Sequence, residues 1–243
     1  MFIDGEIVTD EWEDSDTSAA GFRDALKSLG DVKTINLHIN SPGGSVFEGI
    51  AIYNMLKQNS AHINVYVDGL AASIASVIAM SGDTIFMPSN SMLMIHNPWT
   101  MAVGNANELR KQADDLDQIT KSSVQTYLTK AGDKLDEDTL KQLMDDETWL
   151  TAQEAVDYGL ADEVLESNKA AASIDKRFIQ RYRHVPEQLI KKSEQVKQDQ
   201  SGKDRLDKKK RQQMLKHYQT TLKATNFKVQ NLKEELENEF LRN

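Results

Sequence analysis

The first hundred residues of the chain alternate strand-type and helix-type segments that are joined by short connections. The strand-type segments are expected at residues 2–8, 34–39, 63–67, 84–87 and 91–96. The helix-type segments are expected at residues 17–29, 45–58 and 73–80. Because helices that alternate with strands connect parallel neighbours, this rhythm predicts an α/β fold with a mainly parallel, layered sheet.

A serine among small residues stands where one of these strands passes into a helix. Residues 69–76 read Gly-Leu-Ala-Ala-Ser-Ile-Ala-Ser, which puts Ser73 at the N-terminus of a helix expected to be buried. Unpaired backbone N–H groups and the positive end of the helix dipole favour a developing oxyanion at that place. The ordinary role of a serine before an apolar run is to cap the helix, and this alternative stays open.

An imidazole ends the apolar strand expected at residues 91–96. A serine hydroxyl is a poor nucleophile unless a positioned base removes its proton and a third group orients that base. His96 has the right chemistry for the base, although a lone histidine at a strand end is more often structural. Ser73 and His96 are therefore a candidate nucleophile and general base.

A glycine pair follows another of the expected strands. Residues 35–45 alternate apolar and polar side chains as a half-buried strand does, and then break into Ser-Pro-Gly-Gly. Gly43 and Gly44 permit positive φ and leave backbone N–H groups open to a carbonyl oxygen or to an extended peptide. An ordinary turn is the alternative interpretation.

Four phrases of the chain occur in an order and at a spacing that resemble the Clp-type serine peptidases. They are residues 39–44, 69–73, 94–98 and 149–162. The resemblance covers residues 1–166 and is nearest to the phage-encoded branch, the head-maturation or prohead proteases. It implies a crotonase-like spiral of ββα units with a long projecting helix, which the alternation alone does not distinguish from a doubly wound sheet.

The same resemblance implies roles for single residues. By motif position, Ser73 is the nucleophile, His96 the general base, and the backbone N–H groups of Gly44 and Ile74 the oxyanion donors. No metal or other cofactor is implied.

The third catalytic position departs from the family pattern. The bacterial peptidases have an aspartate where strict register places Glu147 in this chain. A glutamate can orient an imidazole too, but its extra methylene changes the approach. Asp146 is the second candidate, and water or a backbone carbonyl could also serve. If residues 145–147 form only a solvated loop, the site is a Ser–His dyad.

Composition excludes several classes of protein. The chain has no cysteine, so it has no disulfide, thiolate zinc site or cysteine nucleophile. No apolar stretch reaches the roughly 18 residues of a membrane span, and residues 1–4 begin a strand rather than a signal peptide. We therefore expect no membrane association and a cytoplasmic location. The resemblance implies that this location is the host cytoplasm, within assembling proheads.

Residues 105–131 form one long amphipathic pattern that Gly132 can end. Apolar side chains recur there at helical spacing, namely Leu109, Ala113, Leu116, Ile119, Val124, Tyr127 and Leu128. The resemblance implies that this helix packs two rings together and that the protein is a ring-like homo-oligomer. An ordinary surface helix fits the periodicity equally well.

Charge divides the chain into an acidic part and a basic part. Residues 1–166 carry 10 Lys and Arg against 28 Asp and Glu, whereas residues 167–243 carry 19 against 10. Together with the extent of the resemblance, this division predicts a Clp-type serine protease domain at 1–166 and a basic linker and tail at 167–243, helical or flexible, for which a scaffold-like role is one interpretation. Apolar residues between Leu215 and Leu236 follow an interrupted heptad. Nucleic-acid binding is not expected, because no basic face is interleaved with aromatic residues.

These features predict an ATP-independent serine endopeptidase that cleaves scaffold or major capsid precursor segments during phage head maturation. Residues 2–8 align with the first core strand of the bacterial enzymes, so we expect no counterpart of the segment that contacts an unfoldase in that family. The alternatives are a general degradative Clp-type peptidase that works with an unfoldase, and an inactive scaffold on the same fold. A crotonase-fold acyl-CoA enzyme could use Gly44 but has no need of Ser73 and His96.

Overall fold

The computed structural model describes residues 1–167 and 181–186. The chain divides into two units, Met1–Ser193 and Glu194–Asn243, and every described residue belongs to the first. The expected heptad segment lies outside the described residues, and the domain boundary at 166/167 stays a prediction.

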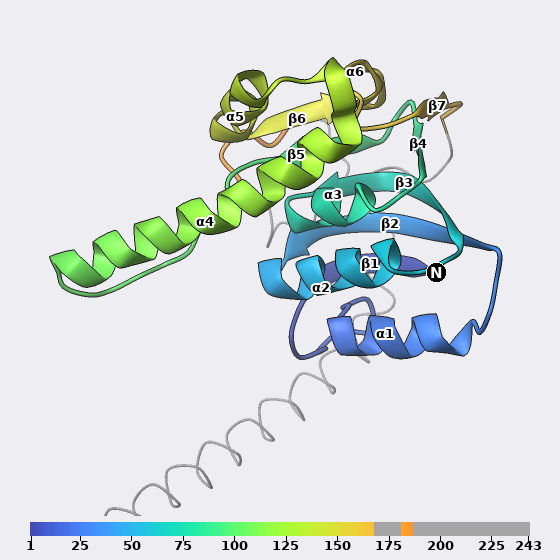
Figure 1. The fold of residues 1–243 in the computed structure, drawn as a ribbon, viewed down its shortest axis with the longest axis horizontal. Coiled ribbons are helices and arrows are strands. Elements are labelled where there is room, and N and C mark those ends of the chain that lie inside the picture. The colour runs from blue at the N-terminus through green and yellow to red at the C-terminus, as the bar shows by residue number, and fades with distance from the viewer. Residues whose placement is uncertain (168–180, 187–243) are drawn as a thin grey trace, which may run out of the picture. The chain divides into compact units, whose positions relative to one another are not determined.

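The described residues form alternating strands and helices (Figure 1). The strands are β1 Phe2–Ile7, β2 Thr34–Gly44, β3 His62–Ala72, β4 Thr84–Pro88, β5 Met92–Ile95, β6 Thr148–Thr151 and β7 Glu163–Leu165. The helices are α1 Ala19–Ser28, α2 Val46–Lys57, α3 Ile74–Ala79, α4 Ala106–Ala131, the short 3₁₀ helix Gly132–Lys134, α5 Glu137–Asp145 and α6 Ala152–Asp157. The predicted α/β class is therefore confirmed.

The sheet is mainly parallel, with the strand order β1-β2-β3-β4-β7. The long strand β3 has two successive neighbours on the same side, because Asn64–Tyr66 pairs with β4 and Leu70–Ala72 pairs with β5. Strand β6 then runs antiparallel to β5. This change of partner along β3 brings the carboxyl end of β3 beside β5, so the residues that follow these two strands are close together.

Alternate residues of the central strands build the core. Ile35, Leu37 and Ile39 of β2 are buried, as are Ile63 and Val65 of β3. Helices α2 and α3 lie over one face of these strands in Figure 1, and all six residues of α3 are buried. Helix α4 projects from the sheet, and its buried residues are confined to its second half, from Ser123 to Ala131.

A close contact between α2 and α3 sets the position of the buried helix. A Cβ atom added at Gly49 of α2 would lie 2.1 Å from Cγ1 of Ile74, the first residue of α3. Only a glycine allows the two helices to approach this closely, because a larger side chain would have to displace α3.

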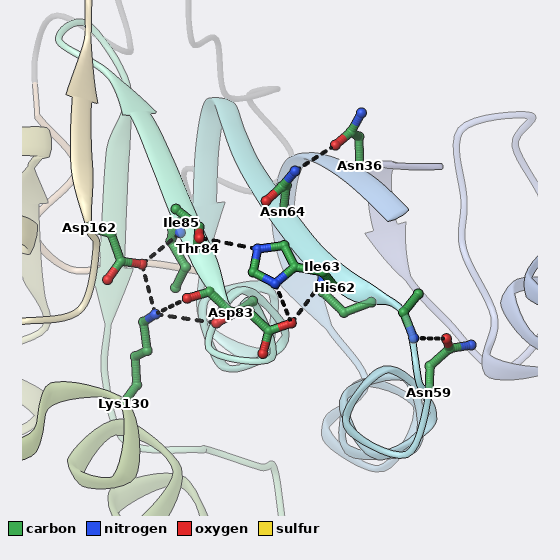
Figure 2. Close-up of polar contacts among 12 residues, drawn as sticks. Asn36, Asn59, His62, Ile63, Asn64, Asp83, Thr84, Ile85, Lys130 and Asp162 are labelled. Carbon is green, nitrogen blue, oxygen red and sulfur yellow. Dashed lines mark hydrogen bonds and ion pairs between the residues drawn. The ribbon is translucent and has the colours of Figure 1, made fainter. Parts of the chain in front are cut away.

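A lysine of α4 ties this helix to two loops of the sheet (Figure 2). Lys130 Nζ donates to the Gly82 carbonyl at 3.2 Å and to Asp162 Oδ2 at 2.7 Å. Asp162 Oδ2 also accepts the backbone N–H of Ile85 in β4 at 2.7 Å. Asp162 ends the fourth of the phrases noted in the sequence, and its contacts give it a structural role.

We predict that Lys130→Met lowers the free energy of unfolding by about 1–2 kcal/mol. The substitution removes the cation from a side chain that is only 12% exposed and takes its donor from two carbonyls. Asp162 Oδ2 keeps the Ile85 N–H but loses its ion pair. Urea unfolding at neutral pH measures the loss. Lys121→Met is the matched control, because Lys121 is an exposed lysine of the same helix. Equal stability of the two variants would show that the contact contributes nothing.

Candidate active site

Ser73 lies between β3 and α3 in an unusual backbone conformation. Its φ is 56° and its ψ is −128°, a region that non-glycine residues rarely adopt and that costs about 1–3 kcal/mol. The Ser73 N–H donates to the Met94 carbonyl of β5 at 3.0 Å, which holds the turn in place. Ser73 occupies the N-cap position of α3, yet its side chain makes no capping hydrogen bond. The hydroxyl is therefore free for another partner.

That partner is His96, the residue after β5. His96 Nε2 lies 2.7 Å from Ser73 Oγ, within the range that a general base needs to take a proton. Burial lowers the pKa of His96 from its usual value, the negative charge of Glu147 opposes this shift, and the positive charge of Arg183 adds to it. The fold thus brings together the two residues that the sequence proposed as a pair.

The glycine pair lies against the nucleophile. Gly43 has a φ of 91° and Gly44 a φ of 147°, both in the range that favours glycine. A Cβ atom at Gly43 would lie 2.8 Å from the Cβ of Ser73, so only glycine permits this approach. Gly44 borders a cavity of about 140 Å³ together with Ser73 and His96. Ile74 opens α3, and the N–H of a first helical residue has no acceptor within its helix.

A tyrosine of the long helix α4 supports the nucleophile through a buried serine. Ser76 Oγ donates to the Ser73 carbonyl at 2.6 Å and lies 2.7 Å from the Tyr127 hydroxyl, which can donate to it. Tyr127 is 1% exposed, and burial raises the pKa of its phenol, so the hydroxyl stays protonated. The sequence showed Tyr127 only as one apolar position of a helix. The feature that could have indicated its role was its hydroxyl, because a tyrosine on the buried face of a helix needs a hydrogen-bond partner for that group.

Of the two acidic candidates, Glu147 is the buried one and lies near enough to His96 for its charge to act on the imidazole. Residues 146 and 147 connect α5 to β6, as the loop interpretation predicts, but Glu147 is only 7% exposed and has a φ of 52°. It lines a cavity of about 520 Å³ together with His96. Asp146 is exposed, and its Oδ2 accepts from Gln142 within α5 at 2.8 Å. Among the described residues, no hydrogen bond joins His96 to Glu147 or Asp146.

The sequence profile of the Clp protease family matches residues 12–168, which is more than half of the chain. The chain belongs to the Clp protease family. The relatives include the ATP-dependent Clp protease proteolytic subunit of Ligilactobacillus salivarius (strain UCC118), which is 35% identical over 171 residues, 70% of this chain and 84% of the relative. The protein of the same name from Pleurastrum terricola is 35% identical over 140 residues, 56% of this chain and 70% of the relative.

Membership of the Clp protease family makes the chain a peptidase and confirms the resemblance seen in its four phrases. Within the described residues, no cluster of three or more His, Asp or Glu side chains could hold a metal ion. No helix in the same part of the chain is long and apolar enough to cross a membrane.

Residues from the predicted tail also reach this Clp-type site. The ring of Tyr182 lies edge-on to His96 and to Trp149, with 5.6 Å between the ring centres in each case. The backbone N–H groups of Arg183 and His184 donate to Glu147 Oε1 at 2.7 and 3.0 Å. The sequence analysis did not anticipate these contacts. The only feature of the sequence that could have indicated them is a tyrosine between two arginines in a polar stretch. This arrangement matches no known motif spacing, so it does not predict a contact with the site.

The lowered pKa of His96 predicts how peptide hydrolysis depends on pH. A base must be neutral to accept a proton, and a lowered pKa keeps the imidazole neutral to lower pH. The acid limb of kcat/KM should therefore have its midpoint below the usual histidine value of 6.5. Glu147→Gln removes the charge that opposes this shift, so the midpoint should move lower still. A midpoint above 6.5 in the unmodified protein would show that burial does not outweigh the charge of Glu147 in setting the pKa of His96.

Proposed function

We propose that the protein is a serine endopeptidase in which Ser73 is the nucleophile and His96 the general base. The observation that carries this proposal is the 2.7 Å contact between Ser73 Oγ and His96 Nε2 beside an open cavity. The positive φ of Ser73 supports it, because strained backbone at a strand-to-helix turn exposes a nucleophile.

The proposed reaction is an ordinary acyl transfer. Ser73 Oγ attacks the substrate carbonyl while His96 Nε2 takes its proton, and the backbone N–H groups of Gly44 and Ile74 stabilise the oxyanion. His96 then returns the proton to the leaving amine, and the acyl group stays on Ser73. Water attacks the acyl-enzyme with His96 again as the base, which releases the second product. Glu147 orients the imidazole in this scheme.

For the biological role, we propose ATP-independent cleavage of phage scaffold or major capsid precursor segments, within assembling proheads in the host cytoplasm. The support is the resemblance of the four phrases to head-maturation proteases. A different observation favours a degradative role: both relatives are named as ATP-dependent Clp protease proteolytic subunits. A degradative peptidase that works with an unfoldase is therefore the second candidate. The word subunit in those names also supports a homo-oligomer, which we propose to be ring-like.

Co-expression with the neighbouring capsid precursor, followed by mass determination of every fragment, tests the biological role. Defined fragments that Ser73→Ala abolishes would support head maturation. Degradation of a folded protein only when a Clp unfoldase and ATP are supplied would favour the second candidate. Absence of Ser73 labelling by a fluorophosphonate would instead favour an inactive scaffold. Light scattering of the purified chain measures the proposed oligomer.

A further inference from the structure

Residues 181–186, which we call the strap, rest on a small apolar platform beside Ser73. The platform consists of side chains at the ends of β3, β5 and β6, namely Leu70, Ala72, Met92, Met94 and Trp149. Tyr182 and Val185 of the strap pack on it. The intervening residues Ala71 and Leu93 belong to the main core, so the platform is on the opposite face of the sheet.

Polar contacts hold the strap on both sides of the Ser73–His96 pair. On one side, Arg181 forms an ion pair with Glu6, and the Tyr182 hydroxyl donates to the carbonyl of Pro42, the residue before the glycine pair. On the other side, the two consecutive backbone N–H groups of Arg183 and His184 donate to Glu147 Oε1. The strap therefore crosses the site from the glycine pair to the acidic residue.

We propose that the strap is an intramolecular pseudosubstrate that keeps the protease latent by covering His96 and engaging the carboxylate of Glu147. This inference rests on the proposed roles of Ser73, His96 and Glu147. The docked strap occupies surface that a substrate peptide needs, and its N–H groups compete with the imidazole for the orienting acid.

The contacts distinguish an inhibitory strap from a bound substrate. Within the described residues, the carbonyls of residues 182–186 accept no hydrogen bond from the N–H groups of Gly44 or Ile74. The cavity of about 140 Å³ beside Ser73 is instead bordered by Arg181 and Tyr182. The strap thus borders the cavity beside Ser73 with the Tyr182 side chain, and no carbonyl of residues 182–186 reaches the proposed oxyanion donors.

Electrostatics oppose catalysis in the docked state. Proton transfer from Ser73 creates an imidazolium, and both burial and the positive charge of Arg183 lower the pKa of His96 and disfavour that ion. Burial raises the pKa of Tyr182, which keeps its hydroxyl protonated as the donor to Pro42. Release of the strap removes Arg183 from the site and frees Glu147 to face the imidazole.

The test compares labelling of Ser73 by a fluorophosphonate in full-length variants. Tyr182→Ala should speed labelling by at least about tenfold, because loss of the ring raises the population of the open state. Val185→Asp weakens the same packing at the other end of the strap and should act in the same direction. His184→Ala is the matched control, because its side chain is exposed and it keeps the backbone N–H that Glu147 accepts.

Tryptic cleavage after Arg181 and Arg183 reports docking of the strap independently of catalysis. It is measured in the Ser73→Ala background, where the protein's own activity cannot contribute, and Tyr182→Ala should speed it as well. Faster tryptic cleavage of the strap without faster labelling of Ser73 would show that the strap does not inhibit. That result would overturn latency but not the assignment of Ser73 as the nucleophile. Absence of labelling in every variant would overturn the proposed function and latency together. Self-cleavage within residues 181–186 would also overturn the proposal, since a pseudosubstrate inhibits only if the protease does not cleave it.

Discussion

Ser73→Ala should lower peptide hydrolysis by about 10⁶-fold, since loss of the nucleophile of a serine peptidase removes nearly all of its rate enhancement. The substitution deletes only the oxygen that contacts His96 and keeps the backbone bond from Ser73 N–H to the Met94 carbonyl. The fold should therefore persist. Hydrolysis of a short unstructured peptide, with circular dichroism as the check on folding, measures both effects.

Ser45→Ala is the matched control for this prediction. Ser45 is partly exposed, follows the glycine pair and makes no capping hydrogen bond with its side chain. Its variant should keep the activity of the unmodified protein. Ser41 and Ser76 are unsuitable controls, because both are buried and donate to backbone carbonyls. Continued cleavage by purified Ser73→Ala would end the assignment of the nucleophile.

Glu147→Gln should reduce kcat/KM by roughly 10²- to 10⁴-fold, by analogy with the acid of a catalytic triad. Glutamine has nearly the same shape, so the buried position is filled while the negative charge beside His96 is lost. Asp146→Asn is the matched control and should have little effect, because Asp146 is exposed and bonded to Gln142.

The comparison of these two acid variants is best made with and without Tyr182→Ala, because the docked strap engages Glu147. If the strap limits the unmodified protein, the effect of Glu147→Gln should be larger in the released background. A larger loss in Asp146→Asn than in Glu147→Gln would assign the orienting role to Asp146. Near-neutral effects of both variants would indicate a Ser–His dyad.

Local periodicity was sufficient to predict the layered α/β class, and four short phrases were sufficient for the family. The predicted strands at 34–39 and 63–67 were too short, since β2 continues to Gly44 and β3 to Ala72. The reason is tertiary: pairing between β2 and β3 resumes after an irregularity between Ile39 and Ser41. A proline and two glycines end a strand by local preference, but neighbouring strands held this segment in register.

The sequence by itself determined the types of residue and the order of segments that can bring a serine beside an imidazole. The tertiary structure decided three further points: Glu147 is buried in the same cavity as His96, Tyr127 supports Ser76, and the strap crosses the site. Each depends on partners far apart in the chain, such as Tyr182 and Pro42, which are 140 positions apart. Periodicity reports only which face of its own element a residue occupies, whereas such pairings arise from the packing of whole elements.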